Sequence, residues 1–199
     1  RPADMPTKQA AAAIGQCELM YFYDKLFTEY NHTVAQLLIT APDIAEGGVR
    51  KENFHNTLER LLDLGALPVI NENDTISTDE IVIGDNDTLS ATVAATVWAE
   101  LLILLSDIDG LYDSDPHKNP DAKLISVVPE LTEDILRLGG GAGSALGTGG
   151  MATKLHAAQI ATAAGCEMVI ANGQAPELLY DIAAGKPVGT RFLTGRANT

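Results

Sequence analysis

An acidic and amide-rich pair of segments is the first candidate for chemistry in this sequence. The segments read INENDT (70–75) and GDNDTLSA (84–91). Carboxylates in such a cluster can bind an ammonium group or orient a lysine, while amides and helix N–H groups can bind a carboxylate. Asn and Asp are also typical of turns and helix N-caps, so a structural role stays open for each residue.

A second polar cluster follows a strongly apolar run in LLILLSDIDGLYDSDP (101–116). Ser106 and Asp107 come directly after the apolar residues, where a buried strand would end. Ligands of α/β sheets bind beyond the carboxyl ends of the strands. The pair is therefore either an ordinary polar turn or the rim of a nucleotide pocket.

A glycine-rich run, GGGAGSALGTGGMATK (139–154), is the third candidate. It matches neither G-x-x-x-x-G-K-[ST] nor the dinucleotide fingerprint G-x-G-x-x-G. Its last part, GTGGMATK, feeds a predicted helix with Lys154 in the first turn. A cation opposes the helix dipole there, but a bound phosphate would be attracted by the lysine and by the N–H groups. The alternative is a disordered surface loop.

The elements that must position these residues alternate between helix and strand. Apolar spacing predicts helices at 7–30, 50–64, 88–99, 129–138, 153–164 and 176–184, and strands at 34–40, 67–71, 81–83, 99–107 and 166–173. Such alternation favours an α/β fold, a three-layer αβα sandwich with a mostly parallel central sheet. The chain shows no internal repeat and no clear linker, so we expect one domain over residues 1–199.

Composition excludes several classes of function. The net charge of −14 argues against nucleic-acid or anionic-membrane partners, which need a basic surface. No apolar stretch is long enough to span a bilayer. Cys17 and Cys166 form no C-x-x-C pair, which favours two free thiols in the cytoplasm. The histidines have no metal-ligand spacing.

Taken in order, these motifs resemble the glutamate 5-kinases of the amino acid kinase family. The matching stretches are KQAAAAIGQ (8–16), INENDT (70–75), GDNDTLSA (84–91), LLSDIDGLYDSDP (104–116), GTGGMATK (147–154) and GTRF (189–192). The resemblance implies transfer of the ATP γ-phosphate to the side-chain carboxylate of L-glutamate, giving γ-glutamyl phosphate for proline synthesis. It also implies ATP and Mg²⁺ as co-substrate and cofactor, feedback inhibition by proline, and a homo-oligomer, a dimer or tetramer.

The resemblance also assigns roles to individual residues. Asp74 and Asn86 are expected to bind glutamate, and Asp87 to organise the catalytic lysines. The residues expected at ATP are Ser106, Asp107, Thr148, Gly149, Gly150, Met151, Ala152, Thr153 and Lys154. Lys154 is expected to act catalytically on the phosphate as well, and no protein side chain is assigned to the metal.

Two motifs of the family do not occur in these residues. They are an early K-x-G-[ST] turn with a second lysine and a later S-S-G-A turn, so we expect a kinase domain truncated at its N-terminus, without the C-terminal PUA domain of some relatives. If the 199 residues were the whole natural chain, negligible kinase activity would be expected. Two alternatives stay open: the kinase half of a bifunctional pyrroline-5-carboxylate synthase, and a non-catalytic glutamate- or proline-binding module.

Overall fold

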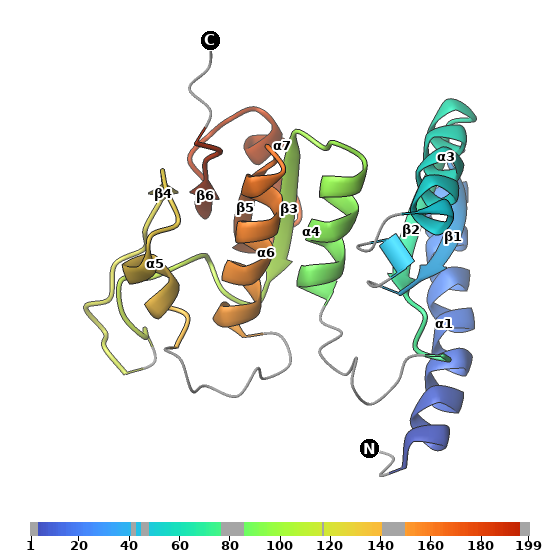
Figure 1. Ribbon diagram of the computed structural model, residues 1–199, viewed down its shortest axis with the longest axis horizontal. Coiled ribbons are helices and arrows are strands. Elements are labelled where there is room, and N and C mark those ends of the chain that lie inside the picture. Colours follow the sequence, from blue (N-terminus) through green and yellow to red (C-terminus); the bar gives the residue numbers. More distant parts are fainter. Residues whose placement is uncertain are drawn as a thin grey trace. The chain divides into compact units, whose positions relative to one another are not determined.

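The chain folds into two compact units, Arg1–Leu89 and Ser90–Thr199 (Figure 1). The computed structural model describes residues 4–40, 43–44, 48–76, 86–116, 118–140 and 150–195. The strand predicted at 81–83 lies outside these ranges. Each unit is described by itself.

The first unit contains a parallel pair of strands with helices packed against them. Its elements are α1 (Met5–Thr28), β1 (Thr33–Ile39), α3 (Val49–Asp63) and β2 (Ala66–Glu72). β1 and β2 run parallel, from Thr33 opposite Ala66 to Ile39 opposite Glu72. α1 packs against β1, and α3 packs against β2. All four elements confirm the sequence-based expectation to within a few residues.

Local signals at the ends of these helices explain where they begin and stop. The Asp4 carboxylate caps α1 by accepting from the Thr7 hydroxyl (2.8 Å) and the Thr7 N–H (3.0 Å). The same two hydrogen bonds, the hydroxyl one first, lower the pKa of Asp4. α3 is followed by Gly65 at φ +71°, a left-handed conformation that glycine adopts without a Cβ penalty.

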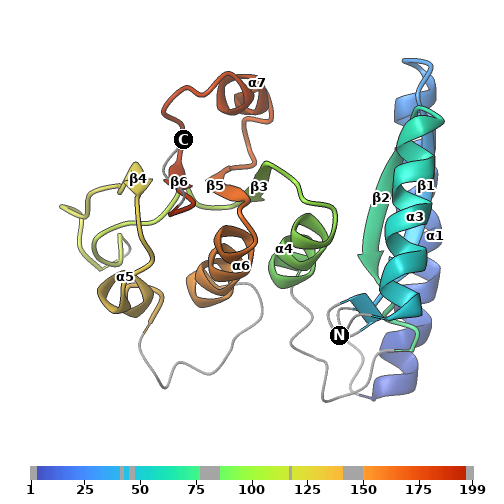
Figure 2. The ribbon, with the colours of Figure 1, turned by 45° about the horizontal axis from the view of Figure 1, so that its top comes forward.

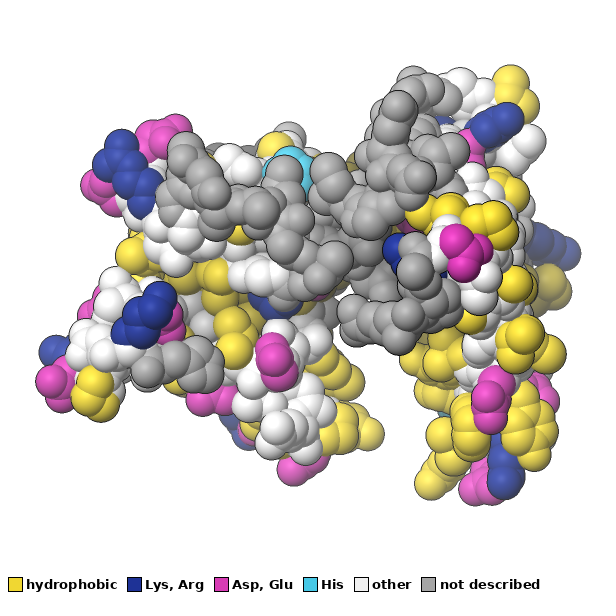
Figure 3. All heavy atoms as spheres, turned by 90° about the horizontal axis from the view of Figure 1, so that it is seen from below, with side chains coloured by type: hydrophobic (Ala, Val, Ile, Leu, Met, Phe, Trp, Pro, Cys, Tyr) yellow, Lys and Arg dark blue, Asp and Glu magenta, His cyan; other side chains and the backbone are white. Residues whose placement is uncertain are grey.

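The long helix α1 combines many apolar side chains with the charged Lys8, Glu18, Asp24 and Lys25, and none of its residues is fully buried. Its large exposed side chains include Ile14, Leu19, Tyr21, Phe22 and Leu26. Hydrophobic side chains are correspondingly visible in yellow over this unit, at the right of Figure 3. Several large apolar side chains exposed along one helix form an unusually hydrophobic surface, and such surfaces often contact further protein.

The second unit contains a four-stranded sheet in the order β3-β5-β6-β4. Its elements are α4 (Asn86–Thr96, which crosses the division between the units), β3 (Leu101–Ser106), β4 (Val127–Val128), α5 (Glu133–Arg137), α6 (Met151–Ala163), β5 (Glu167–Asn172), α7 (Leu178–Ala183) and β6 (Thr190–Phe192). β3 pairs parallel with β5 and β4 with β6, whereas β5 and β6 are antiparallel. Parallel pairing therefore dominates, as predicted.

Helices cover both faces of this sheet, which gives three layers (Figure 2). On β5, Met168 and Ile170 join the main core with residues of α4 and α6, whereas Val169 and Ala171 pack with Ile182 of α7. All four β5 residues are inaccessible to solvent. Successive side chains of a strand point to opposite faces, so this central strand serves both cores.

Two short strands, β4 and β6, were not predicted from the sequence. They span only two and three residues, too few to show a hydrophobic period. Among the described residues, no helix combines the length and apolar character needed to cross a membrane.

Candidate active site

The carboxyl ends of β3 and β5 lie side by side and form the core of the candidate site. Ser106 is the last residue of β3 and stands opposite Asn172, the last residue of β5. The Gly173 N–H donates to the Ser106 carbonyl at 2.7 Å, which joins the two segments at the ends of β3 and β5. The Ser106 hydroxyl donates to the carboxylate of Asp107 at 3.1 Å. The predicted pair therefore lies where a parallel sheet binds its ligands.

The segment after Asp107 is held by residues of neighbouring strands. Asn172 Nδ2 donates to Asp109 Oδ1 at 2.7 Å, and Asp109 Oδ2 accepts from the Tyr112 hydroxyl at 3.3 Å. Burial, reinforced by the charge of Asp109, raises the pKa of Tyr112. The raised pKa lets the phenol keep its proton, and so donate to Asp109, to a higher pH than an ordinary tyrosine would.

Helix α6 brings its N-terminus to the same edge of the sheet. A short turn joins the end of α6 to the start of β5, and the two pack against each other in opposite directions (Figure 1). Gly150 is the N-cap, so the predicted phosphate-binding residues Met151, Ala152, Thr153 and Lys154 form the first turn. Thr148 and Gly149 lie outside the described residues.

Lys154 is buried in this first turn, with only 6% of its surface exposed. Thr153, at 3% exposed, donates its hydroxyl to the Gly150 carbonyl at 2.6 Å. Burying an ammonium group is costly, and the positive end of a helix dipole adds to the cost. Both unfavourable effects would be offset by an anion bound at this turn.

A glycine at the start of the glycine-rich run packs directly onto α6. A Cβ added to Gly139 would lie 2.9 Å from Leu155 Cδ1 and 3.1 Å from Ala152 Cα. Glycine at this position therefore permits the backbone to approach the first two turns of the helix.

A separate pocket in the first unit contains the predicted glutamate ligand Asp74. Its volume is about 220 Å³, and its lining residues are Ala12, Gly15, Gln16, Leu19, Leu38, Asn71, Glu72, Asn73, Asp74 and Thr75. Asn71 Nδ2 donates to Gln16 Oε1 at 2.9 Å, and Gln16 Nε2 donates to Gln36 Oε1 at 3.0 Å. These hydrogen bonds orient the amides of Gln16 and Asn71 in the pocket wall, and Gln36 supports Gln16 from outside the lining.

Sequence reasoning did not assign roles to Gln16 and Asn71. Both lie in stretches recognised as motifs, KQAAAAIGQ and INENDT, which is the signal that could have found them. Their contact joins residues 55 positions apart, so the local pattern could not show it.

Asn86 and Asp87 begin helix α4. Asn86 is exposed and Asp87 is half-buried in the first turn, where a carboxylate is favoured by the helix dipole. Within the described ranges, no cluster of three or more His, Cys, Asp or Glu side chains could hold a metal ion.

Comparison with known proteins identifies the family to which this geometry belongs. The amino acid kinase family matches residues 2–172. The glutamate 5-kinase of Clostridium tetani is 54% identical over 192 residues, which are 96% of this chain and 72% of the relative. The glutamate 5-kinase of Clostridium perfringens is 52% identical over 197 residues, covering 97% of this chain and 73% of the relative.

The chain belongs to the amino acid kinase family, among the glutamate 5-kinases. Solved structures of lower identity share the fold. The UMP kinase of Bacillus anthracis superimposes with a TM-score of 0.64 at 18% identity, over 98% of this chain and 72% of the other. An isopentenyl phosphate kinase gives a TM-score of 0.60 at 20% identity, over 88% of this chain and 65% of the other.

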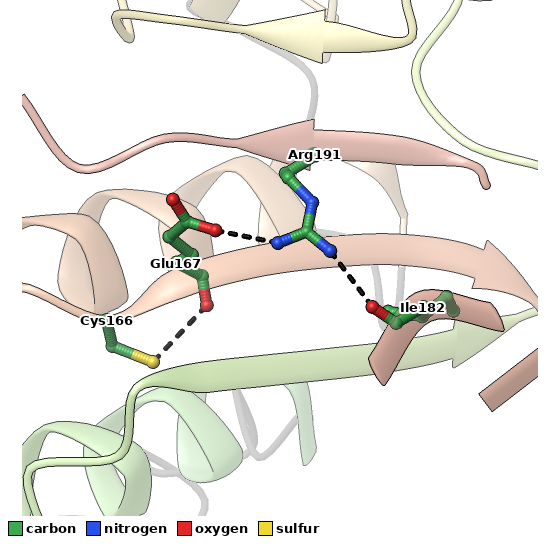
Figure 4. Close-up of polar contacts among 4 residues, drawn as sticks. All are labelled: Cys166, Glu167, Ile182 and Arg191. Atoms are coloured by element: carbon green, nitrogen blue, oxygen red, sulfur yellow. Dashed lines mark hydrogen bonds and ion pairs between the residues drawn. The ribbon is translucent and has the colours of Figure 1, made fainter. Parts of the chain in front are cut away.

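The GTRF stretch of this amino acid kinase supports the sheet. Arg191 donates to Glu167 Oε2 at 2.7 Å and to the Ile182 carbonyl at 3.1 Å, which ties β6 to β5 and to the last turn of α7 (Figure 4). Beside them, the Cys166 thiol donates to the Glu167 carbonyl at 3.3 Å, and burial raises the pKa of that thiol. The contacts of Arg191 therefore indicate a structural role, which is to connect β6 with β5 and α7.

Proposed function

We propose that this protein transfers the γ-phosphoryl group of ATP to the side-chain carboxylate of L-glutamate, which gives γ-glutamyl phosphate, the first intermediate of proline synthesis. The observation that carries the proposal is the identity of about 50% to glutamate 5-kinases over nearly the whole chain. The buried Lys154 at the N-terminus of α6 is the feature of the site that agrees with it best.

The chemistry needs positioning and positive charge rather than a base. A glutamate side chain is already ionised near neutral pH, so it can attack without losing a proton. The obstacle is repulsion between this anion and the polyphosphate, together with charge on the transferring group. Lys154 and the N–H groups of the first turn of α6 would oppose both effects from fixed positions.

The nucleotide is proposed to lie across the carboxyl edge of the second unit. Ser106 and Asp107 would contact it beyond β3, and Gly150–Lys154, with Thr148 and Gly149, would hold its phosphates. Mg²⁺ usually binds through substrate phosphates, waters and one or two carboxylates, so we propose that it enters as MgATP.

Glutamate is proposed to bind at the pocket of Asp74, with Asn86 as a second ligand. A carboxylate can hold the amino group, and the amides of Gln16 and Asn71 line the same pocket. The side chain of glutamate is already ionised, so the reaction needs no general base. Asp87 is therefore proposed to orient a lysine near the phosphate instead.

Further properties of glutamate 5-kinases are proposed for this protein on the same ground. They are feedback inhibition by proline, a cytoplasmic location and a homo-oligomer. The exposed apolar side chains of α1 support the last, since monomeric proteins rarely expose large apolar patches.

Acceptor specificity tests the proposal. Release of ADP from MgATP should require L-glutamate, and UMP or isopentenyl phosphate should not replace it. Asp74→Ala should raise KM for glutamate about 10- to 100-fold, as expected when a charged hydrogen-bond partner is lost. Asp121→Ala, which changes an exposed carboxylate in the second unit, is the matched control and should behave as wild type. Turnover with UMP and none with glutamate would refute the proposal.

A further inference from the structure

Thr190 in β6 is completely buried, and its hydroxyl joins two distant parts of the chain. It accepts from the Leu111 N–H at 2.8 Å and donates to the Ile125 carbonyl at 2.6 Å. The Ile125 N–H in turn donates to the Leu111 carbonyl at 2.8 Å. The segment between β3 and β4 forms a loop, and the Thr190 hydroxyl binds the backbone at both ends of this loop, at Leu111 and Ile125.

The neighbouring Gly110 allows this loop to lie directly against β6. A Cβ at Gly110 would stand 2.5 Å from Thr190 Oγ1 and 3.0 Å from Thr190 N. Gly110 is three residues beyond Asp107 along the chain. The contact with Thr190 thus fixes the backbone very close to the proposed nucleotide rim.

Asn172 holds the same segment from the end of β5. Its Oδ1 accepts from the Gln174 N–H at 3.0 Å, which orients the amide so that Nδ2 faces Asp109 Oδ1 at 2.7 Å. The segment 107–111 is consequently held at two residues: Asn172 of β5 bonds to Asp109, and Thr190 of β6 bonds to Leu111. Both Asn172 and Thr190 lie far from this segment in the sequence.

We propose that Thr190 and Asn172 are positioning residues for the nucleotide: through Leu111 and Asp109 they fix the strand-to-loop segment that carries Ser106 and Asp107. This inference rests on the proposed nucleotide site. The proposed role acts through these hydrogen bonds and requires no contact of Thr190 or Asn172 with ATP. A segment that is already ordered loses less conformational freedom when ATP binds, so the holding contacts favour nucleotide binding. Glutamate binding, assigned to other residues, does not depend on them.

Steady-state kinetics of the full protein separates this role from a purely structural one. Thr190→Val keeps the shape but removes the hydroxyl, and Thr190→Ser keeps the hydroxyl. We expect Thr190→Val and Asn172→Ala to raise KM for ATP about five- to tenfold, because each removes the hydrogen bonds that hold the segment, with KM for glutamate unchanged. Thr190→Ser should restore a value within twofold of wild type.

Two controls match these variants. Thr96→Val removes another buried threonine hydroxyl, which donates to the Thr92 carbonyl at 2.8 Å in α4, and should leave KM for ATP unchanged. Asn172→Ala and Asp109→Ala should be less than additive in KM for ATP, because both remove the same hydrogen bond between Asn172 and Asp109. Asn172 and Asp109 lie at the edge of the sheet rather than in its core. Their variants therefore still test the inference if Thr190→Val does not fold.

The outcomes distinguish the inference from the proposed function. Equal changes in both KM values, or additive effects of Asn172→Ala and Asp109→Ala, would overturn the positioning role. If wild type gave no glutamate-dependent turnover, the proposed function would fail, and calorimetry with MgATP alone would still decide the inference. Weaker binding of MgATP by Asn172→Ala would support it, and unchanged binding, or no binding by wild type, would overturn it.

Discussion

At the scale of single residues, the buried Lys154 is the clearest sign of a ligand in the structure. A lysine at 6% exposure in the first turn of a helix is unfavourable for both solvation and the helix dipole. A phosphate bound at the same turn would oppose both effects. We propose nucleotide binding as a reason for the burial of this cation.

Replacing Lys154 tests that explanation. Lys154→Met removes the charge but keeps most of the apolar volume, and we expect kcat to fall about 10²- to 10³-fold, the usual cost of losing one group that stabilises transition-state charge. Thr153, its neighbour, should tolerate Thr153→Ser with little change, because the hydroxyl bonded to Gly150 is retained. Initial rates at saturating MgATP and glutamate give the comparison. A Lys154→Met protein with wild-type kcat would contradict the assignment.

At the scale of elements, the sheet of the second unit depends on a close approach of β6 to β5. Gly189 has φ +64°, and a Cβ there would overlap the Ile170 carbonyl oxygen. That approach also places Thr190 opposite Ile170 in the antiparallel register, where its hydroxyl reaches Leu111.

Two glycine substitutions separate the close approach from backbone strain alone. Gly185 also has a positive φ, +75°, but a Cβ there meets nothing within 4 Å. Gly185→Ala should cost about 1 kcal/mol of unfolding free energy, the usual penalty for a left-handed non-glycine residue. Gly189→Ala should cost more than about 3 kcal/mol, since β6 must also move away. Urea-induced unfolding measures both, and equal losses would argue against the close approach.

At the scale of the whole molecule, the exposed apolar surface of α1 supports self-association. Phe22 and Leu26 are each about half exposed on a helix without a single buried residue. The double substitution Phe22→Ser with Leu26→Ser should therefore lower the molar mass measured by light scattering to that of one chain. Tyr180→Ser, which removes an isolated exposed side chain from α7, should not. A wild-type protein that is monomeric at all concentrations would refute the proposed oligomer.

Much of this architecture could be predicted because the information is local. Apolar periodicity located α1, α3 and α6, and polar residues after apolar runs located Ser106 and Asp107. The helix predicted to begin at residue 153 begins at Met151, with Gly150 as its N-cap, so GTGGMATK indicated this helix start to within two residues. The residues 81–83, 148 and 149 lie outside the described ranges, so those expectations stay predictions.

The rest depended on contacts that no local pattern contains. Thr190 reads as an ordinary residue of GTRF, yet it bonds to Leu111, 79 positions away. Asn172 and Asp109 are 63 positions apart, and each looks like a turn residue in its own segment. Hydrogen bonds of this kind arise only when the strands have been brought into register.

Trapping the reaction product with hydroxylamine shows directly whether the protein phosphorylates glutamate. With MgATP, L-glutamate and hydroxylamine, the full-length natural protein should form γ-glutamyl hydroxamate in proportion to the ADP released, because an acyl phosphate reacts readily with this nucleophile. Calorimetry on the same preparation reports whether MgATP and glutamate bind. We expect hydroxamate formation to require both substrates and to be lost in Lys154→Met. Binding of both ligands with no hydroxamate and no ADP would contradict it and would favour a non-catalytic binding module.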